Sequence, residues 1–211
     1  MQIEKLTSVQ LDVLREIGNI GAGNAATSMS LLTNQKVDMD VPVVQLIPFG
    51  QVMELIGGAD ELVVAIYLRI LGEAPGTVYF IMSLAEAEQL VRQIIHDNSF
   101  TLGMEEEIDD FAISALMEAG NILTGSYLSA LSDFININMQ PSIPNLAIDM
   151  AGAILSVGLI ELSNVTDYAI VIDTRMNNDE DRNRFKGHFF LLPDTETVPK
   201  IFNALGIDYY E

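Results

Sequence analysis

The sequence predicts an α/β fold organised as one unit with an internal pseudo-two-fold repeat. A Glu-x-x-Asn motif at residues 16–19 recurs 102 positions later, at residues 118–121. A proline follows each of the two asparagines at the same spacing, as Pro42 and as Pro144. Each copy also shows the same order of patterns: a long helix, short β-type runs and a second helix. The sequence has 211 residues, 49% of them hydrophobic, which is enough to build a sizeable core.

The first long helix is expected to begin after Thr7, which forms a capping-box pattern with Gln10. Its apolar face recurs at steps of three and four residues: Leu11, Leu14, Gly18, Gly21, Ala25, Met29 and Leu32. A glycine inside a helix costs about 1 kcal/mol relative to alanine. The glycines therefore predict either very close packing of this face or a bend near residues 21–23.

The remaining elements follow in order along both copies. A second capping box, Ser83 to Glu86, opens a helix that reaches about His96. The acidic segment 105–110 favours the start of the next long helix, because negative charge stabilises helix N-termini. That helix has its own inward stripe: Ile113, Leu116, Gly120, Thr124, Tyr127 and Leu131. A final helix is expected over about 197–205, before Gly206. The β-type runs are 37–44, 62–70, 77–82, 168–175 and 188–192.

The two copies could form two separate small domains or one pseudo-symmetric domain. No Pro/Gly/Ser-rich linker separates them, and each copy alone has few strands. We therefore expect a single domain over residues 1–211, made of repeats at about 8–100 and 105–211. The second copy has about nine extra residues, which we assign to a polar loop over 177–184.

Composition excludes several classes of function. The net charge of −20 argues against nucleic acid and anionic membranes, which are bound through Lys and Arg. Cysteine is absent, so disulfides, thiolate catalysis and zinc–thiolate sites are excluded. The N-terminus lacks the pattern of a signal peptide, and the apolar run 150–160 is too short to span a membrane. We expect a cytoplasmic protein without membrane insertion.

The Glu-x-x-Asn pairs are the candidate functional residues. Residues three apart are neighbours on a helix, so Glu16 lies beside Asn19, and Glu118 beside Asn121. Helical spacing places both pairs opposite the apolar stripes, so they should face outward. An outward carboxylate–carboxamide pair is poorly suited to holding a metal alone, but it suits docking onto another molecule. A simpler interpretation is that these are solvated residues on an exposed helix face. This interpretation is disfavoured because the pair and its proline occur twice at the same spacing.

Asparagine suits one chemistry in particular. Its carboxamide donates and accepts hydrogen bonds, so it can hold a water molecule in line with an electrophile without reacting itself. Phosphoryl transfer rewards such positioning, because its transition state is loose. Asp12 and Ser114, four residues before the glutamates, extend the two polar faces by one turn.

The full pattern, [Asp/Ser]-x3-Glu-x2-Asn-x22-Pro, resembles that of the CheC/CheX/FliY family of chemotaxis phosphatases, and the surrounding residues are most similar to its CheC branch. The resemblance covers essentially the whole chain. It implies a sheet flanked by two long site-bearing helices, and hydrolysis of the aspartyl phosphate of the response regulator CheY.

The resemblance also implies roles for individual residues. Asn19 and Asn121 would orient the attacking water, and Glu16 and Glu118 would engage a lysine of the regulator. Asp12, Ser114, Pro42 and Pro144 would be supporting positions. The protein would need no cofactor or metal of its own, because Mg²⁺ would arrive with the phosphorylated regulator.

A second partner is implied as well, the receptor deamidase CheD. The family's CheD-facing segment resembles Leu146 to Met150, where Asp149 matches the aspartate associated with that contact. Without the resemblance to the family, the apolar segment 151–159 is more simply explained as core.

Two alternative functions are a non-catalytic adaptor that sequesters CheD or phosphorylated CheY, and a stand-alone rotor component. Two intact carboxamides favour the enzyme over the adaptor. We do not expect a stand-alone rotor component, because the sequence leaves no residues for a rotor domain after Glu211.

Overall fold

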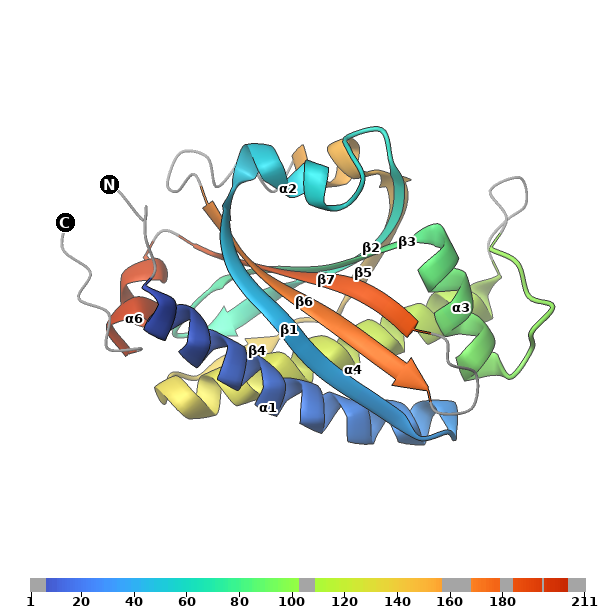
Figure 1. The fold of residues 1–211 in the computed structure, drawn as a ribbon, viewed down its shortest axis with the longest axis horizontal. Coiled ribbons are helices and arrows are strands. Elements are labelled where there is room, and N and C mark those ends of the chain that lie inside the picture. Colours follow the sequence, from blue (N-terminus) through green and yellow to red (C-terminus); the bar gives the residue numbers. More distant parts are fainter. Residues whose placement is uncertain (1–6, 103–108, 157–167, 179–183, 195, 205–211) are drawn as a thin grey trace.

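The computed structural model shows one antiparallel sheet of seven strands with helices on both of its faces (Figure 1). The structure describes residues 7–102, 109–156, 168–178, 184–194 and 196–204. The predicted fold class, a single α/β domain with an internal repeat, is confirmed.

The helices are α1 (Ser8–Thr33), α2 (Phe49–Leu55), α3 (Leu84–Ile95), α4 (Asp110–Ile135) and α6 (Val198–Ala204), and residues 151–156 are also helical. The strands are β1 (Val37–Pro48), β2 (Leu62–Gly72), β3 (Gly76–Ser83), β4 (Met139–Pro141), β5 (Asn145–Met150), β6 (Tyr168–Asn178) and β7 (Arg184–Pro193). No helix in the described ranges is long and apolar enough to cross a membrane.

The order of the strands shows how the two repeats combine. The sheet runs β1-β6-β7-β3-β2-β4, and β5 also pairs with β2. The first strand of repeat one, β1, pairs with β6 of repeat two. In return, β4 and β5 of repeat two pair with β2 of repeat one. The pseudo-two-fold axis therefore passes between β7 and β3, and each repeat completes the sheet of the other.

The helices that carry the two motifs correspond residue by residue. Both α1 and α4 have 26 residues, and their ends differ by the repeat offset of 102. Each ends in an asparagine in the left-handed conformation, Asn34 with φ 50° and Asn136 with φ 53°. Asparagine tolerates this conformation because its short polar side chain hydrogen-bonds locally. The hydroxyl of Ser30 accepts a hydrogen bond from the N–H of Val37 in β1, and that of Ser132 accepts one from the N–H of Met139 in β4.

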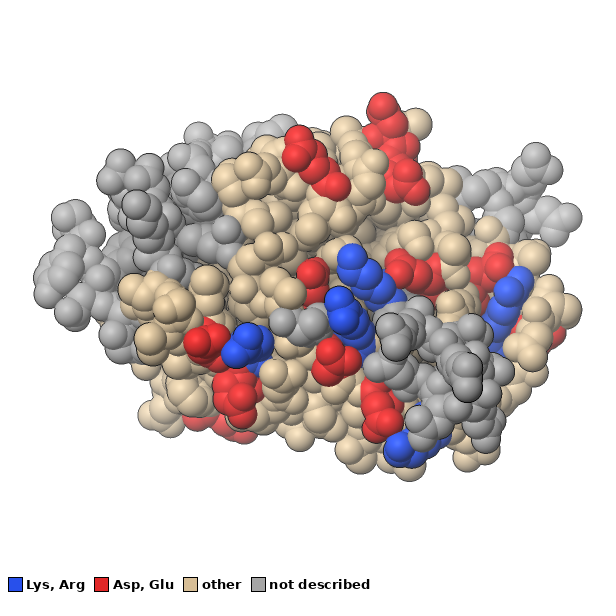
Figure 2. Space-filling model, in the orientation of Figure 1, with Lys and Arg blue, Asp and Glu red and all other residues tan. Residues whose placement is uncertain are grey.

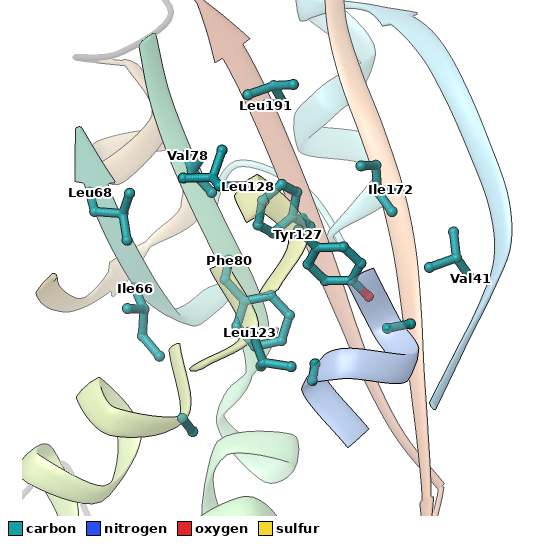
Figure 3. Close-up of a cluster of buried hydrophobic side chains, with 14 of the residues drawn as sticks. Val41, Ile66, Leu68, Val78, Phe80, Leu123, Tyr127, Leu128, Ile172 and Leu191 are labelled. Carbon is teal, nitrogen blue, oxygen red and sulfur yellow. The ribbon is translucent and has the colours of Figure 1, made fainter. Parts of the chain in front are cut away.

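Both long helices pack side by side against the same face of the sheet (Figure 1). Their contact is close because Gly21 has no side chain: a Cβ there would lie 2.9 Å from the Cα of Tyr127. Tyr127 extends from α4 toward β6 (Figure 3). Its hydroxyl lies 2.9 Å from that of Thr174 in β6. Burial raises the pKa of Tyr127 to about 12, so this hydroxyl keeps its proton. The glycine face thus packs closely at Gly21, while α1 continues unbroken through residues 21–23.

The opposite face of the sheet is covered by α2 and by the helical residues 151–156. Val52 of α2 packs together with Ala151 and Leu155. These residues contact the side chains of the central strands that point to this second face of the sheet. The predicted core role of segment 151–159 is therefore confirmed for Ala151 and Leu155, whereas Ala153 is exposed. Residues 157–159 lie outside the described residues.

Most predicted elements are present. Both capping boxes form, Thr7 with Gln10 and Ser83 with Glu86. The second long helix begins at Asp110 with Asp109 as its N-cap, and residues 105–108 of the acidic segment lie outside the described residues. The central part of the predicted loop at 177–184 is likewise not described, since β6 ends at Asn178 and β7 begins at Arg184.

Three short elements were not predicted, namely α2, β4 and β5. The first has only seven residues and no side-chain N-cap, and β4 has three residues. Neither is long enough to show a helical or alternating period. Pairing with β2 holds β4 and β5 in place, and this pairing is a tertiary contact that the local sequence does not encode.

Candidate functional site

The two Glu-x-x-Asn pairs lie on solvent-exposed faces of α1 and α4. Glu16 and Asn19 are exposed, while Ile17 and Gly18 between them are buried. Glu118 and Asn121 are likewise exposed, and Ala119 and Gly120 between them are buried. Both pairs can therefore be reached by another molecule. We call Asp12, Glu16, Asn19 and Pro42 the first site, and Ser114, Glu118, Asn121 and Pro144 the second site.

At the first site, the asparagine is tied to the sheet. The backbone N–H of Val41 donates a hydrogen bond of 2.9 Å to Oδ1 of Asn19. A backbone N–H can only donate, so this bond fixes which side of the carboxamide is oxygen. Among the described residues, no acceptor is found for the Nδ2 amino group of Asn19, and Oδ1 keeps a second lone pair.

The tie depends on an irregularity in β1. The register of β1 against β6 shifts between Asp40 and Val43, at Val41 and Pro42. Proline has no N–H to give to a ladder, so it is tolerated at edges and bulges. Gly18 completes the arrangement, because a Cβ there would lie 3.3 Å from Cγ1 of Val41. The glycine lets the strand sit directly on the helix, beside Asn19.

At the second site, the equivalent strand is seated differently. The break between β4 and β5 contains Ile143, the counterpart of Val41. Ile143 is 83% exposed, whereas Val41 is 2% exposed and points into the core (Figure 3). Its neighbour Ser142 is bonded to the backbone of Arg69 in β2, through bonds of 2.9 and 3.0 Å. Within the described ranges, no hydrogen bond is found for the side chain of Asn121.

The supporting residues also differ between the sites. Asp12 forms an ion pair of 2.9 Å with Arg15, both side chains being well exposed. Ser114 instead donates to the carbonyl of Asp110, at 2.8 Å, within its own helix. The position equivalent to Arg15 is Met117, so the second site has fewer charges. Pro144 is half-buried in the break between β4 and β5.

Comparison with known proteins gives the family. The CheC-like family model matches residues 9–46 and again residues 111–148, the same offset of 102. Over 197 residues, the chain is 45% identical to the CheY-P phosphatase CheC of Bacillus subtilis, which covers 93% of this chain and 94% of that protein. This chain belongs to the CheC-like family. The family predicted from the doubled motif is thereby confirmed.

Other relatives share part of the sequence or the fold. The flagellar motor switch phosphatase FliY of Bacillus subtilis is 27% identical over 145 residues, which is 69% of this chain and 37% of that protein. The crystal structure of Thermotoga maritima FliY has a TM-score of 0.75 at 21% identity and covers 95% of this chain and 98% of that one. The FliM middle domain from H. pylori has a TM-score of 0.64 at 13% identity, covering 95% and 99%. Both solved structures support the fold alone.

The remaining sequence predictions concern metals and charge. Among the described residues, no group of three or more His, Asp or Glu side chains is placed to hold a metal ion. On the face shown in Figure 2, acidic residues are spread over the surface, and most of the fewer basic residues lie beside them. Pairs such as Arg15–Asp12 and Lys36–Asp38 are of this kind. Exposed pairs of this type contribute little to stability.

Asp149, the predicted partner-binding residue, lies at the exposed end of β5. Its carboxylate accepts a hydrogen bond of 2.7 Å from the N–H of Met150, which is 51% exposed. In the described part of the chain, β5 pairs only with β2, so its other edge carries no strand.

Sequence reasoning missed the tie between Val41 and Asn19 and the different placement of Ile143. The proline spacing was the available signal, because the residue before each proline is the one whose backbone differs between the sites.

Proposed function

We propose that this chain is a response-regulator phosphatase that hydrolyses the aspartyl phosphate of CheY through both sites. The observation that carries the proposal is the duplicated, exposed Glu-x-x-Asn pair in a chain 45% identical to a CheY-P phosphatase over 93% of its length. The reaction consumes one water molecule. Its oxygen forms a bond to phosphorus, the bond from phosphorus to the aspartyl oxygen breaks, and inorganic phosphate and a free carboxylate are released.

The carboxamides supply positioning. Water must approach phosphorus opposite the leaving carboxylate, and fixing that geometry removes much of the entropic part of the barrier. At the first site, Nδ2 of Asn19 can donate a hydrogen bond to the water or to a phosphoryl oxygen, while the second lone pair of Oδ1 can accept a hydrogen bond from the water. Little deprotonation is needed early in a loose transition state, so a neutral amide suffices.

The glutamates would align the regulator with each site. Glu16 and Glu118 lie one helical turn before the asparagines and present a negative charge beside each carboxamide. We propose that each engages a lysine next to the phosphoryl group of the regulator. The Mg²⁺ ion belongs to the substrate in this account, as part of the phosphorylated regulator. A cytoplasmic location, where such regulators are phosphorylated, also remains a proposal.

The competing function is that of an adaptor, which would bind phosphorylated CheY or CheD without turnover. The two functions differ in stoichiometry. With the chain at one hundredth of the concentration of phosphorylated CheY, an enzyme releases many equivalents of phosphate per chain. An adaptor at that ratio leaves the rate of phosphate release unchanged, and this result would exclude the phosphatase.

We further propose that CheD docks at the end of β5, beside Asp149. The exposed side chains of Asp149 and Met150 and the strand-free edge of β5 support this site. An Asp149→Ala variant should capture less CheD in a pull-down while its phosphate-release activity is retained. Asp133→Ala, which removes an exposed carboxylate from the far end of α4, is the matched control. Equal capture of CheD by both variants would refute the assignment.

A further inference from the structure

The glycines of the two site helices fall into two kinds. A Cβ at Gly18 or Gly21 would press on Val41 or Tyr127, and one at Gly120 would lie 2.5 Å from Ile66. Packing therefore requires glycine at positions 21 and 120 and leaves little room for a Cβ at position 18. A Cβ at Gly23 or Gly125 would meet nothing within 4 Å.

Backbone conformation does not require the two open glycines either. The glycines with positive φ in the described residues are Gly57, Gly58 and Gly72, all outside the long helices. Apart from proline, glycine is the least favourable residue in a helix interior. Gly23 and Gly125 therefore weaken their helices, and within the described part of the chain no close contact explains them.

The two open glycines occupy equivalent places. They are 102 residues apart, and each lies four residues after the asparagine and seven after the glutamate of its site. At about 100° per residue, steps of four and seven return to the same face of a helix. Gly23 thus lies in line with Glu16 and Asn19, and Gly125 with Glu118 and Asn121.

Side-chain direction makes these places critical. Side chains on a helix tilt toward its N-terminus, so each covers the turn before its own Cα. Any side chain at position 23 would lean over the carboxamide of Asn19, and any at 125 over that of Asn121. The glycines leave one flank of each carboxamide bare.

We propose that Gly23 and Gly125 are clearance positions, at which the main chain of the phosphate-bearing loop of the regulator lies against the helix during dephosphorylation. This inference rests on the proposed phosphatase function. It assigns the two glycines a positioning role, since neither supplies a reacting group. The occupant is a segment of polypeptide, because the space beside the carboxamide is that of a missing side chain along an exposed helix.

The test uses the full chain with one site at a time. Asn121→Asp leaves the first site alone, and in this background Gly23 is changed to Ala and to Leu. Gly23→Ala should raise the unfolding temperature by about 2–4 °C, because alanine is the better helix former. It should also raise KM for phosphorylated CheY about threefold, and Gly23→Leu should lower kcat/KM about 100-fold, the loss expected for a displacement near 1 Å. The same changes at Gly125 in the Asn19→Asp background should behave alike.

A matched control separates helix stabilisation from clearance. Asn24→Ala improves helix propensity at the neighbouring exposed position, on a different face, and should leave kcat/KM unchanged. Unchanged kcat/KM in Gly23→Leu would overturn the inference while leaving the phosphatase assignment intact.

Binding of beryllofluoride-treated CheY, measured by calorimetry, distinguishes the two failures. The proposal predicts that the Asn121→Asp protein binds this probe and that Gly23→Leu weakens binding at least about tenfold. Binding unaffected by Gly23→Leu would reject the clearance role. No binding by the unsubstituted protein would reject the proposed function, and the clearance role with it.

Discussion

The two sites carry the same motif on helices of equal length, yet the strand beside each motif is placed differently. At the first site, Val41 is buried against Gly18, and its N–H holds the carboxamide of Asn19. At the second, the equivalent Ile143 is turned out into solvent, and Gly120 packs on Ile66 of β2 instead. The duplicated motif is thus held in two ways: the first is better organised, and the second is more open and apolar. An organised group favours kcat, and an exposed apolar surface favours docking.

The largest expected difference between the sites is in stability. Val41→Asp should lower the free energy of unfolding by about 3–5 kcal/mol, because it places a carboxylate in the core. Ile143→Asp, the same change at the equivalent position, should alter it by less than about 0.5 kcal/mol. Urea denaturation of the two variants measures both values. Equal losses would mean that the two strands are seated alike, contrary to the structure.

The next difference concerns docking. Phe111 is 62% exposed and lies two turns before Glu118 on the same face, where the first site has Val9, 68% exposed. In the Asn19→Asp background, Phe111→Ala should raise KM for phosphorylated CheY about tenfold, since exposed aromatic residues are frequent anchors of interfaces. Val9→Ala, made in the Asn121→Asp background, should raise KM about two- to threefold, in proportion to its smaller area. A larger effect of Val9→Ala would reverse the comparison.

A smaller difference is expected in the chemical step. Holding a side chain in one conformation saves about 0.5–1.5 kcal/mol of ordering when a complex forms, equivalent to about two- to tenfold. The Asn121→Asp protein, which keeps the tied Asn19, should therefore show a kcat about three times that of the Asn19→Asp protein. Single-turnover dephosphorylation of CheY at saturating enzyme compares the two. A higher kcat for the second site would show that the hydrogen bond from Val41 restrains Asn19 unproductively.

The smallest effect is expected at Arg15, which the second site replaces with Met117. Arg15→Met should change the free energy of unfolding by less than about 1 kcal/mol, because its ion pair with Asp12 is exposed. In the Asn121→Asp background it should raise KM about twofold, since the carboxylate of Asp12 is no longer neutralised near a phosphorylated partner. Met117→Leu in the other background is the control and should leave KM unchanged.

Much of this arrangement could be predicted from the sequence because it is local or periodic. The capping residues Thr7 and Ser83 define where two helices begin, and helical spacing places Glu16 and Asn19 opposite the buried stripe. The doubled motif gives the internal repeat. These features depend on residues within a few turns of one another.

The asymmetry of the sites could not be predicted, because it arises from contacts between distant segments. The bond from Val41 to Asn19 joins residues 22 apart and depends on how β1 pairs with β6. Ile143 is turned outward because Ser142 is bonded to Arg69, 73 residues away. At both sites an apolar residue precedes the proline, so the local sequence pattern is the same. The tertiary contacts decide whether that residue is buried or exposed.

The most direct test of the account is the lifetime of the aspartyl phosphate of CheY in the presence of the Asn19→Asp, Asn121→Asp double variant. Aspartate is close to asparagine in shape and still accepts the N–H of Val41, but it has no amide donor and repels a phosphoryl group. The account predicts that the unsubstituted protein shortens this lifetime, that each single variant keeps part of the effect, and that the double variant leaves the intrinsic lifetime unchanged with its unfolding midpoint preserved. A double variant that shortens the lifetime as much as the unsubstituted protein would contradict the assignment of both sites.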